Sequence, residues 1–226
     1  MEIKPIGYIH TKFPDKFGIP RQSMIVDTPG YIELLEPYND LNATRGLEDF
    51  SHLWLIWQAS ENLDSNGQWE WHPTARPPRL GGNERKGIFA TRSPFHPNLI
   101  GMSCVKLDRI ENGVLHVLGA DVVDGTPLLD IKPYIAYSDS IYDARSGYAQ
   151  APEVGVLEVV LAEGVEGSID SDDLRTISQI IAQNPRPHYH EDEDRIYGMR
   201  YDSYEIKFSI GDGVATILSI IPLQSQ

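Results

Sequence analysis

Two stretches of the sequence concentrate residues whose types and spacing could do chemistry. Residues 76–101 mix arginine with glycine and proline, and residues 121–134 place three aspartates (Asp121, Asp124, Asp130) within ten positions. Glycine lets a ligand approach the main chain, proline fixes a loop, and arginine offers planar donors to a carboxylate or phosphate. The turn after Asp124 could clasp a ligand with its backbone, and aspartates suit ribose hydroxyls or an amino group. The alternative interpretations are tight turns at barrel corners and an ordinary charged turn.

Other familiar catalytic patterns are absent from the sequence or have simpler interpretations. No strand is followed by Gly-x-Gly-x-x-Gly, and neither a Walker A sequence nor a Gly-x-Ser-x-Gly elbow occurs. The single cysteine, Cys104, lies in an apolar stretch and is interpreted as a structural thiol rather than a nucleophile. His188 and His190 could bind a metal with Glu191 and Asp192, but this segment is typical of a solvated loop, and we expect no metal site.

The distribution of charge is more informative than its total. The 226-residue chain carries a formal net charge of −14, which by itself argues against binding nucleic acid. Between Arg76 and Arg109, however, seven lysines and arginines stand against only two acidic residues. A local basic stripe on an acidic body fits an electrostatic footprint for nucleic acid, although a solvated face would have the same composition.

Most of the chain up to about residue 135 is typical of short strands separated by turns. The expected strands cover residues 3–10, 31–35, 53–57, 86–91, 103–110 and 114–120. The stretch 53–57 is apolar at every position, which suggests burial on both faces. Asn112-Gly113 between two alternating runs indicates a hairpin because both turn positions need a positive φ. Many short strands with little helix favour an antiparallel sheet that closes on itself.

The composition changes near Tyr137, and a second unit follows. Residues 138–152 lack periodicity and are expected to form a linker or arm. A strand is expected over 154–162, a helix over 170–183 that Asp170 or Ser171 caps, and a hairpin of 205–210 with 214–221. We therefore predict a mainly β protein, with a single antiparallel closed-sheet β-barrel over residues 1–137 and a small α+β domain over residues 153–226.

The chain resembles the TrmO family, also called TsaA-like proteins, along nearly its whole length. The matching segments are residues 6–9, 17–22, 45–54, 76–82, 87–101, 121–134 and 184–189. Members of this family methylate N6 of threonylcarbamoyladenosine at position 37 of certain tRNAs. The resemblance implies a β-barrel methyltransferase that uses S-adenosylmethionine, acts on the anticodon stem-loop of tRNA and is usually a homodimer.

The resemblance also implies which residues bind the cofactor. S-adenosylmethionine would contact Gln22, Ser23, Met24, Ala59, Ser60, Arg92, Met102, Asp124, Gly125, Thr126, Pro127 and Leu128. Arg92 is the candidate for anchoring a carboxylate, and Asp124 is the candidate for holding the cofactor or accepting a proton, so these two are the predicted catalytic residues. The basic residues expected to contact tRNA are Arg76, Arg79, Arg85, Lys86, His96 and Arg186.

Two positions depart from the family's usual Arg-Pro-Asn-Pro-x-Gly sequence. His96 stands in place of arginine, and Leu99 in place of the second proline. His96 keeps a hydrogen-bond donor but is mostly neutral near pH 7, and Leu99 removes one rigid turn element. Two rival hypotheses remain: a module that binds S-adenosylmethionine or tRNA without catalysing transfer, and a metal-dependent hydrolase that uses residues 188–192. Turnover tests the first rival, and sensitivity to a chelator tests the second.

The location of the protein is expected to be cytoplasmic, with no membrane partner. The first residues lack the apolar region of a signal peptide, and no uninterrupted apolar run approaches the length of about 18 residues that a membrane span needs. A single cysteine excludes an internal disulfide, which agrees with this expectation.

Overall fold

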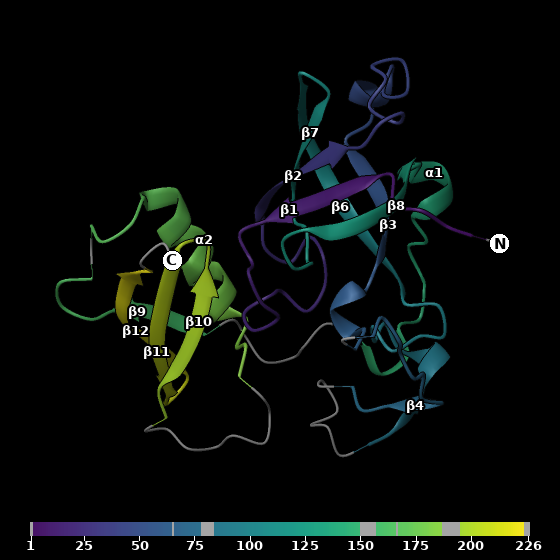
Figure 1. Ribbon diagram of the computed structural model, residues 1–226. Helices are drawn as coiled ribbons and strands as arrows, with labels where there is room; N and C mark the ends of the chain where they lie inside the picture. Colours follow the sequence, from purple (N-terminus) through teal and green to yellow (C-terminus); the bar gives the residue numbers. More distant parts are fainter. Residues whose placement is uncertain are drawn as a thin grey trace.

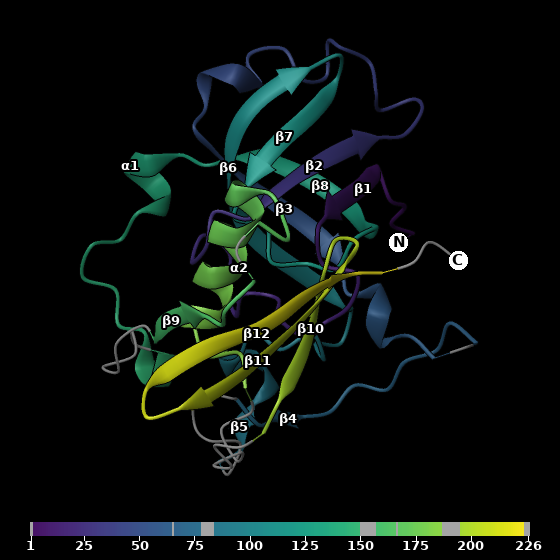
Figure 2. The same ribbon diagram turned by 90° about the vertical axis from the view of Figure 1, so that its left-hand side faces the viewer.

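The computed structural model describes residues 2–64, 66–77, 84–149, 157–165, 167–186 and 195–223. A closed barrel and a smaller sheet covered by one helix lie side by side, as Figures 1 and 2 show. The predicted fold class, a mainly β protein with a closed antiparallel barrel and a small α+β lobe, is confirmed. No helix in the described ranges is long and apolar enough to cross a membrane.

The barrel consists of six antiparallel strands in the order β1-β2-β7-β6-β3-β8. Their bounds are β1 Gly7–Thr11, β2 Pro29–Leu34, β3 His52–Gln58, β6 Ile100–Glu111, β7 Val114–Leu118 and β8 Thr126–Pro133. β6 and β7 form the predicted hairpin, in which Asn112 and Gly113 have φ values of 51° and 82°. Because the sheet closes, each barrel strand is paired along both of its edges.

The interior of the barrel is filled by alternate side chains of its strands. On β3, Leu53 and Leu55 are fully buried against residues such as Ile9 and Leu115. Trp54 points to the other face and is only half-buried, with its indole N–H donating to Asp139 at 3.0 Å. The expectation that 53–57 is buried on both faces is therefore wrong, because the outer face of a closed barrel is covered only where a loop crosses it.

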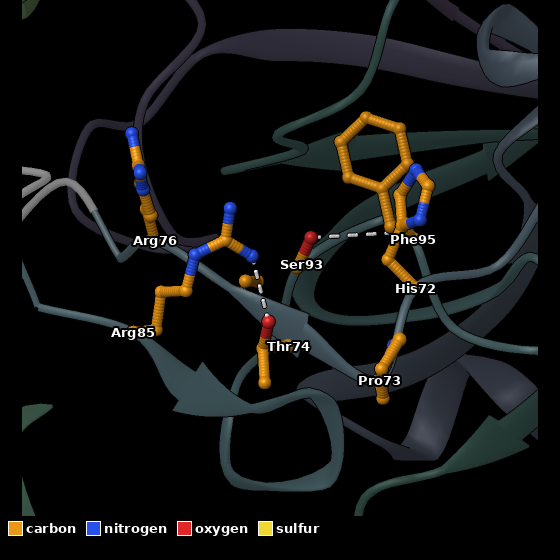
Figure 3. Close-up of a pocket in the computed structure, with 8 residues that line it drawn as sticks. His72, Pro73, Thr74, Arg76, Arg85, Ser93 and Phe95 are labelled. Atoms are coloured by element: carbon orange, nitrogen blue, oxygen red, sulfur yellow. Dashed lines mark hydrogen bonds between the residues drawn. The ribbon is translucent and has the colours of Figure 1, made fainter.

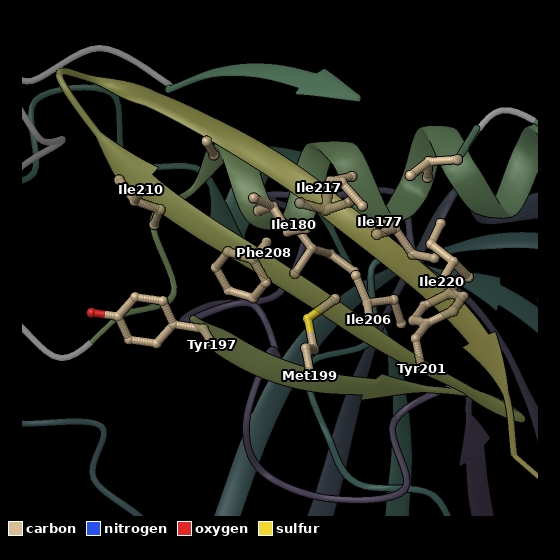
Figure 4. Close-up of a cluster of buried hydrophobic side chains, with 14 of the residues drawn as sticks. Ile177, Ile180, Tyr197, Met199, Tyr201, Ile206, Phe208, Ile210, Ile217 and Ile220 are labelled. Atoms are coloured by element: carbon tan, nitrogen blue, oxygen red, sulfur yellow. The ribbon is translucent and has the colours of Figure 1, made fainter. Parts of the chain in front are cut away.

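The C-terminal unit is a four-stranded sheet with one helix packed on it. The strand order is β10-β11-β12-β9, with β9 parallel to β12. The elements are β9 Glu158–Leu161, α2 Ser171–Ala182, β10 Tyr197–Tyr201, β11 Tyr204–Gly211 and β12 Val214–Pro222. Ile177 and Ile180 of α2 pack against Phe208 and Ile217 of the sheet in one apolar core (Figure 4). The helix begins where predicted because the Asp170 carboxylate accepts the Asp172 backbone N–H at 2.9 Å.

Short elements account for most of the differences from the predicted secondary structure. The expected strand over 86–91 is only β5 (Lys86–Gly87), paired with β4 (Thr74–Ala75), and a 3-10 helix over Ile88–Ala90 follows it. The Thr91 hydroxyl and backbone N–H both donate to Ile88 O, which turns the chain away from an extended path. A short helix, α1 (Ala136–Asp139), spans the start of the expected arm. The strands β4, β8 and β10 were not predicted, and β8, which closes the barrel between β1 and β3, lies in the aspartate-rich run that was interpreted as a possible charged turn.

The segment between β1 and β2 connects the two units. Phe13 is buried in the core of the C-terminal unit and meets Tyr201 edge-on, with 5.8 Å between ring centroids. Lys12 Nζ donates to both carboxylate oxygens of Asp173 on α2, at 2.5 and 2.7 Å. Further along, Arg21 donates to Asn184 O at 3.0 Å. The loop that carries the predicted cofactor contacts at 22–24 is therefore anchored to the C-terminal unit by its preceding residues.

Candidate active site

The candidate site is built from loops at the end of the barrel where β3 ends and β6 begins. Met24 N donates to Gly119 O at 3.0 Å, and Gly119 N donates to Thr28 O at 2.9 Å. The loop before β2 therefore lies along the residues that follow β7. Ala59 N donates to Leu99 O at 2.8 Å, which joins the end of β3 to the residue before β6. These main-chain hydrogen bonds position the loops independently of their side chains.

Two of the predicted site residues contact each other directly. Arg92 Nη1 donates to Gln22 Oε1 at 2.7 Å, and Gln22 Nε2 donates to Arg21 O at 2.6 Å. The Gln22 amide thus uses its acceptor for the guanidinium and its donor for the main chain, so that its orientation is fixed. Arg92 is exposed, and a guanidinium has five N–H groups, so it can still bind an anionic group.

Asp121 is directed into the same region by a chain of hydrogen bonds. Trp57 Nε1 donates to Ser103 Oγ at 3.0 Å, and the Ser103 hydroxyl donates to Asp121 Oδ1 at 2.5 Å. Because an indole N–H can only donate, the hydroxyl hydrogen of Ser103 must point toward Asp121.

The environment of Asp121 favours a positively charged ligand. Burial raises the pKa of the Asp121 carboxyl, while hydrogen bonds from Ser103 and the Ser23 backbone and the charge of Arg92 oppose that rise. A cation placed beside this carboxylate would relieve the desolvation of its charged form.

Gly101 is required at the start of β6 because the Trp57 ring lies directly against it. A Cβ atom at this position would lie 2.3 Å from Trp57 Cζ2, far inside van der Waals contact. Register explains the contact, since Gly101 and Trp57 are partners across β6 and β3. The glycine therefore lets the indole reach Ser103, two residues further along the same strand.

The predicted catalytic residue Asp124 is directed to β1. Its Oδ1 accepts the Thr11 backbone N–H at 3.1 Å and lies 3.1 Å from His10 Nδ1, while the side chain is 48% exposed. Asp121, three residues earlier, is directed to β6 instead. Hydrogen bonds thus connect Gln22 with Arg92 and the Ser23 backbone with Asp121. Asp124 instead forms its hydrogen bonds with residues of β1.

The remaining predicted cofactor residues differ in what they can offer a ligand. Leu128 is fully buried in the barrel core, and the buried Thr126 hydroxyl donates to Val123 O at 2.6 Å. Gly125 is exposed with a φ of 73°, Pro127 is partly buried, and Met102 is 48% exposed on β6. Ala59 is buried, and Ser60 begins a 3-10 helix. Their contact with a cofactor stays a prediction.

The predicted tRNA-binding residues lie mainly in the excursion between β3 and β6. Arg76 and Arg85 line a pocket of about 500 Å³ together with Phe95 and Ser93, as Figure 3 shows. Lys86 forms an ion pair with Glu84 in the same region. Of the others, Arg186 is half-buried after α2, and Arg79 lies outside the described residues. The expected basic stripe carries less net positive charge in β6, because Arg109 forms an ion pair with Asp108 at 2.6 Å.

Both departures from the family sequence have a local structural explanation. His96 Nε2 lies 3.0 Å from Thr91 O, and because a carbonyl only accepts, this nitrogen must carry the hydrogen. Leu99 is buried, has a φ of 53°, and donates its backbone N–H to His96 O at 3.1 Å. A proline has a φ near −65° and no N–H, so it cannot replace Leu99 in this backbone conformation.

The remaining nucleophile and metal candidates gain no support as reactive sites. Burial, followed by the charge of Asp139, raises the pKa of the Cys104 thiol, which disfavours the reactive thiolate. Among the residues that the structure describes, no three His, Cys, Asp or Glu side chains gather into a metal site. The hypothesised metal ligands at 188–192 lie outside the described residues.

Sequence reasoning missed Asp121, Ser103 and Trp57 as members of one site. Asp121 stands in the aspartate-rich run, but residue type and spacing give no sign that it, rather than Asp124, faces Arg92. Trp57 and Ser103 are 46 positions apart in the chain. The signal that could have joined them is the alternation of β3 and β6, once their pairing register is known.

Comparisons with known proteins match nearly the whole chain. The family model "tRNA-methyltransferase O N-terminal domain" matches residues 8–140, and "TrmO C-terminal domain" matches residues 157–223. The "tRNA (adenine(37)-N6)-methyltransferase" of Escherichia coli K12 is 37% identical over 234 residues, which cover 98% of each chain. The "Putative S-adenosylmethionine-dependent methyltransferase RcsF" of Pseudomonas aeruginosa is 42% identical over 207 residues, covering 88% of this chain and 87% of that one. A crystal structure of TrmO from P. aeruginosa superposes with a TM-score of 0.80 at 34% identity, over 98% of this chain and 97% of that one.

Proposed function

The chain belongs to the TrmO family, and we propose that it transfers the methyl group of S-adenosylmethionine to N6 of adenine 37 in tRNA. The Escherichia coli relative, which it matches end to end, is named for methylation of this atom. The Pseudomonas aeruginosa relative is named for this cofactor. The finer proposal is that the adenine already carries a threonylcarbamoyl group, as the resemblance to the family implies.

The observation that carries the proposal is the meeting of Gln22, Arg92 and Asp121 at one end of the barrel. S-adenosylmethionine has a carboxylate, an ammonium and a sulfonium group. An exposed guanidinium fits the carboxylate, and a half-buried carboxylate fits a positive group. The residues present therefore match the charges of the cofactor. The neighbours proposed to complete its site are Ser23, Met24, Ala59, Ser60, Met102, Asp124, Gly125, Thr126, Pro127 and Leu128.

The chemistry asks the protein for placement and for help with one proton. When bound, S-adenosylmethionine supplies an electrophilic methyl group on a positively charged sulfur. The lone pair of the target N6 is delocalised in a urea-like group, so the protein must align this atom and remove its hydrogen. We assign proton acceptance to Asp124, whose carboxylate Thr11 and His10 hold in place while it stays half-exposed. Arg92 anchors a carboxylate, either that of the cofactor or that of the threonyl group.

On the RNA side, the proposed contacts are the cationic and polar residues Arg76, Arg79, Arg85, Lys86, His96 and Arg186. They would bind the anticodon stem-loop, since guanidinium and ammonium groups neutralise backbone phosphates. The proposed division of the chain is a catalytic barrel over 1–137, an arm over 138–152 and a C-terminal domain over 153–226. A homodimer is proposed by resemblance to the family, and light scattering during size-exclusion chromatography tests it.

The decisive experiment measures methyl transfer from labelled S-adenosylmethionine to tRNA with and without prior threonylcarbamoylation. Nucleoside digestion and mass spectrometry should reveal methylated threonylcarbamoyladenosine only in the modified tRNA. Arg92→Ala should lose most of the turnover, Arg92→Lys should recover part of it, and Arg200→Ala on β10 provides a matched arginine control. Methylation of both tRNAs at equal rates would refute the requirement for the threonylcarbamoyl group.

The second candidate function is a module that binds the cofactor or tRNA without catalysing transfer. The observation that favours it is the inward turn of His96 toward Thr91 O, where the family has an arginine. Stoichiometric binding of S-adenosylmethionine with no methyl transfer to either tRNA would support this module and exclude the enzyme. Multiple turnovers would exclude the module.

A further inference from the structure

The pocket in the excursion between β3 and β6 has two chemically different ends. Figure 3 shows the guanidinium groups of Arg76 and Arg85 on one side and the rings of Phe95 and His72 on the other, with Ser93 between them. Its volume of about 500 Å³ is in the range of sites that bind small organic ligands. The proposed function assigns a role to the arginines at one end of this pocket and none to the rings at the other end.

At the cationic end, Arg85 is held in place and both guanidinium groups face the pocket. Arg85 Nη1 donates to Thr74 Oγ1 at 2.8 Å, so one of its donors fixes the side chain and the others are left for a ligand. The acid nearest in sequence, Glu84, pairs with Lys86. Within the described ranges, neither Arg76 nor Arg85 has a carboxylate partner. Two guanidinium groups without a carboxylate partner among the described residues can bind a phosphate.

The aromatic end is a supported ring with part of its surface exposed. Phe95 stacks on Trp69 with 6.1 Å between ring centroids and 25° between ring planes, and it remains 42% exposed. Trp69 is fixed in turn because its indole N–H donates to Pro97 O at 3.2 Å. The Phe95 backbone N–H also donates to Ser93 Oγ at 3.3 Å. A ring held from behind in this way loses little conformational freedom when a flat ligand stacks on it.

The pocket adjoins the site proposed for methyl transfer. Ser93, which lines it, directly follows Arg92, whose guanidinium binds Gln22. A ligand in the pocket would therefore contact the residue next to Arg92 in the chain. The proposed target lies in the anticodon loop of tRNA, and loop nucleotides are unpaired, so the nucleotides next to the target are available for binding.

We propose that this pocket receives one unpaired nucleotide of the tRNA loop beside the target adenine, with its phosphate on Arg76 and Arg85 and its base stacked on Phe95. This inference rests on the proposed function, because it assumes that tRNA is the substrate. Recognition of single-stranded RNA commonly combines a cationic path for the backbone with aromatic rings for the bases. A carboxylate ligand would need the guanidinium groups but would leave the supported ring of Phe95 without a role.

Binding of a fluorescent anticodon stem-loop RNA to the full chain tests the aromatic contact. Phe95→Ala should weaken binding about tenfold, from the usual contribution of one base stacked on an aromatic ring, and Phe95→Trp should restore it. Phe50→Ala is the matched control, because Phe50 is 37% exposed and precedes β3, at the opposite end of that strand from the pocket. Unchanged affinity of Phe95→Ala would overturn the proposal.

Abasic RNA distinguishes a stacked base from a structural effect of the substitution. Each nucleotide beside the target is replaced in turn by an abasic residue, and affinity is measured with the wild type and with Phe95→Ala. At one position the two proteins should bind equally, because the base that Phe95 contacts is missing. An equal difference between them for every RNA would overturn the proposal.

The cationic contact has its own readout in the salt dependence of binding. Arg85→Gln should lower the slope of log affinity against log salt concentration by about 0.7, the value for one phosphate of a single strand. An unchanged slope would overturn the assignment of the phosphate. Failure of the proposed function is recognised separately, because the wild type would then fail to methylate tRNA at all.

Discussion

Replacement of Gly101 by alanine is expected to disconnect Trp57 from the Ser103–Asp121 pair. The added Cβ would lie 2.3 Å from Trp57 Cζ2, and two more atoms of the same ring lie within 2.5 Å. Non-bonded carbon atoms prefer a separation of about 3.5 to 4.0 Å, so the indole must move by more than about 1 Å. Its N–H then loses the 3.0 Å hydrogen bond to Ser103 Oγ.

The size of the effect follows from overpacking and from the lost donor. Extra carbon atoms in a packed region destabilise a protein by about 1 to 3 kcal/mol, which lowers the Tm of a chain of this size by about 2 to 12 °C. Ser103 becomes free to rotate, so its hydrogen bond to the charged Asp121 weakens. Hydrogen bonds to charged groups contribute about 1.5 to 3 kcal/mol. If Asp121 holds the positive group of S-adenosylmethionine, loss of most of this contribution should lower the affinity for the cofactor about tenfold.

Thermal unfolding and calorimetric titration with S-adenosylmethionine test the two parts separately. Gly87→Ala is the matched control, because a Cβ on Gly87 meets no heavy atom within 4 Å and should change neither quantity. An unchanged Tm for Gly101→Ala would refute the packing argument. A lower Tm with unchanged cofactor affinity would show that the chain from Trp57 to Asp121 does not serve the cofactor.

Three further predictions concern single residues. Burial raises the pKa of the Asp121 carboxyl above its ordinary value of 3.8, so the wild type loses stability as the pH rises from 3.8 through the raised pKa. Asp121→Asn has no such titration and should gain stability relative to the wild type as the pH rises above 3.8. A difference between the two proteins that is constant with pH would contradict the burial argument. Leu99→Pro should lower the free energy of unfolding in urea by more than about 1 kcal/mol, since the φ of 53° and the N–H bond to His96 are both lost. A proline variant as stable as the wild type would disprove this account. Asp170→Ala should lose about 1 kcal/mol through its N-cap hydrogen bond while Asp170→Ser retains it, and equal stability of the two variants would count against the cap.

Much of the fold could be predicted because it depends on local patterns. The alternation along β6 and β7 and the Asn-Gly turn between them require a hairpin whatever surrounds it. The cap at Asp170 and the apolar face of α2 likewise determine where that helix begins and which side it buries. β5 was predicted too long because the hydrogen bonds of Thr91 to Ile88 O, which end the extended path, are not visible in residue type alone.

The candidate site was predicted less completely than the fold. The sequence segments that resemble the family include Gln22 and Arg92, which form a hydrogen bond although they are 70 positions apart in the chain. The matching sequence segments led to the choice of Asp124 instead of Asp121. Both are aspartates of one run, and only the bend of the chain decides which of them faces β6. Phe95 and Trp69 gave no signal of their contact, since stacking of two rings depends on which loops meet, and these two positions are 26 residues apart in the chain.

The sequence by itself determined the class of fold, the β6–β7 hairpin, the helix α2 and the family, because each depends on residue type and short-range order. Only the tertiary structure decided that Phe13, from the barrel's first loop, fills the core of the C-terminal unit. It also decided that Trp57, Ser103 and Asp121 form one hydrogen-bonded chain. The physical reason is that burial and hydrogen-bond direction depend on which surfaces meet, and distance along the chain does not specify that.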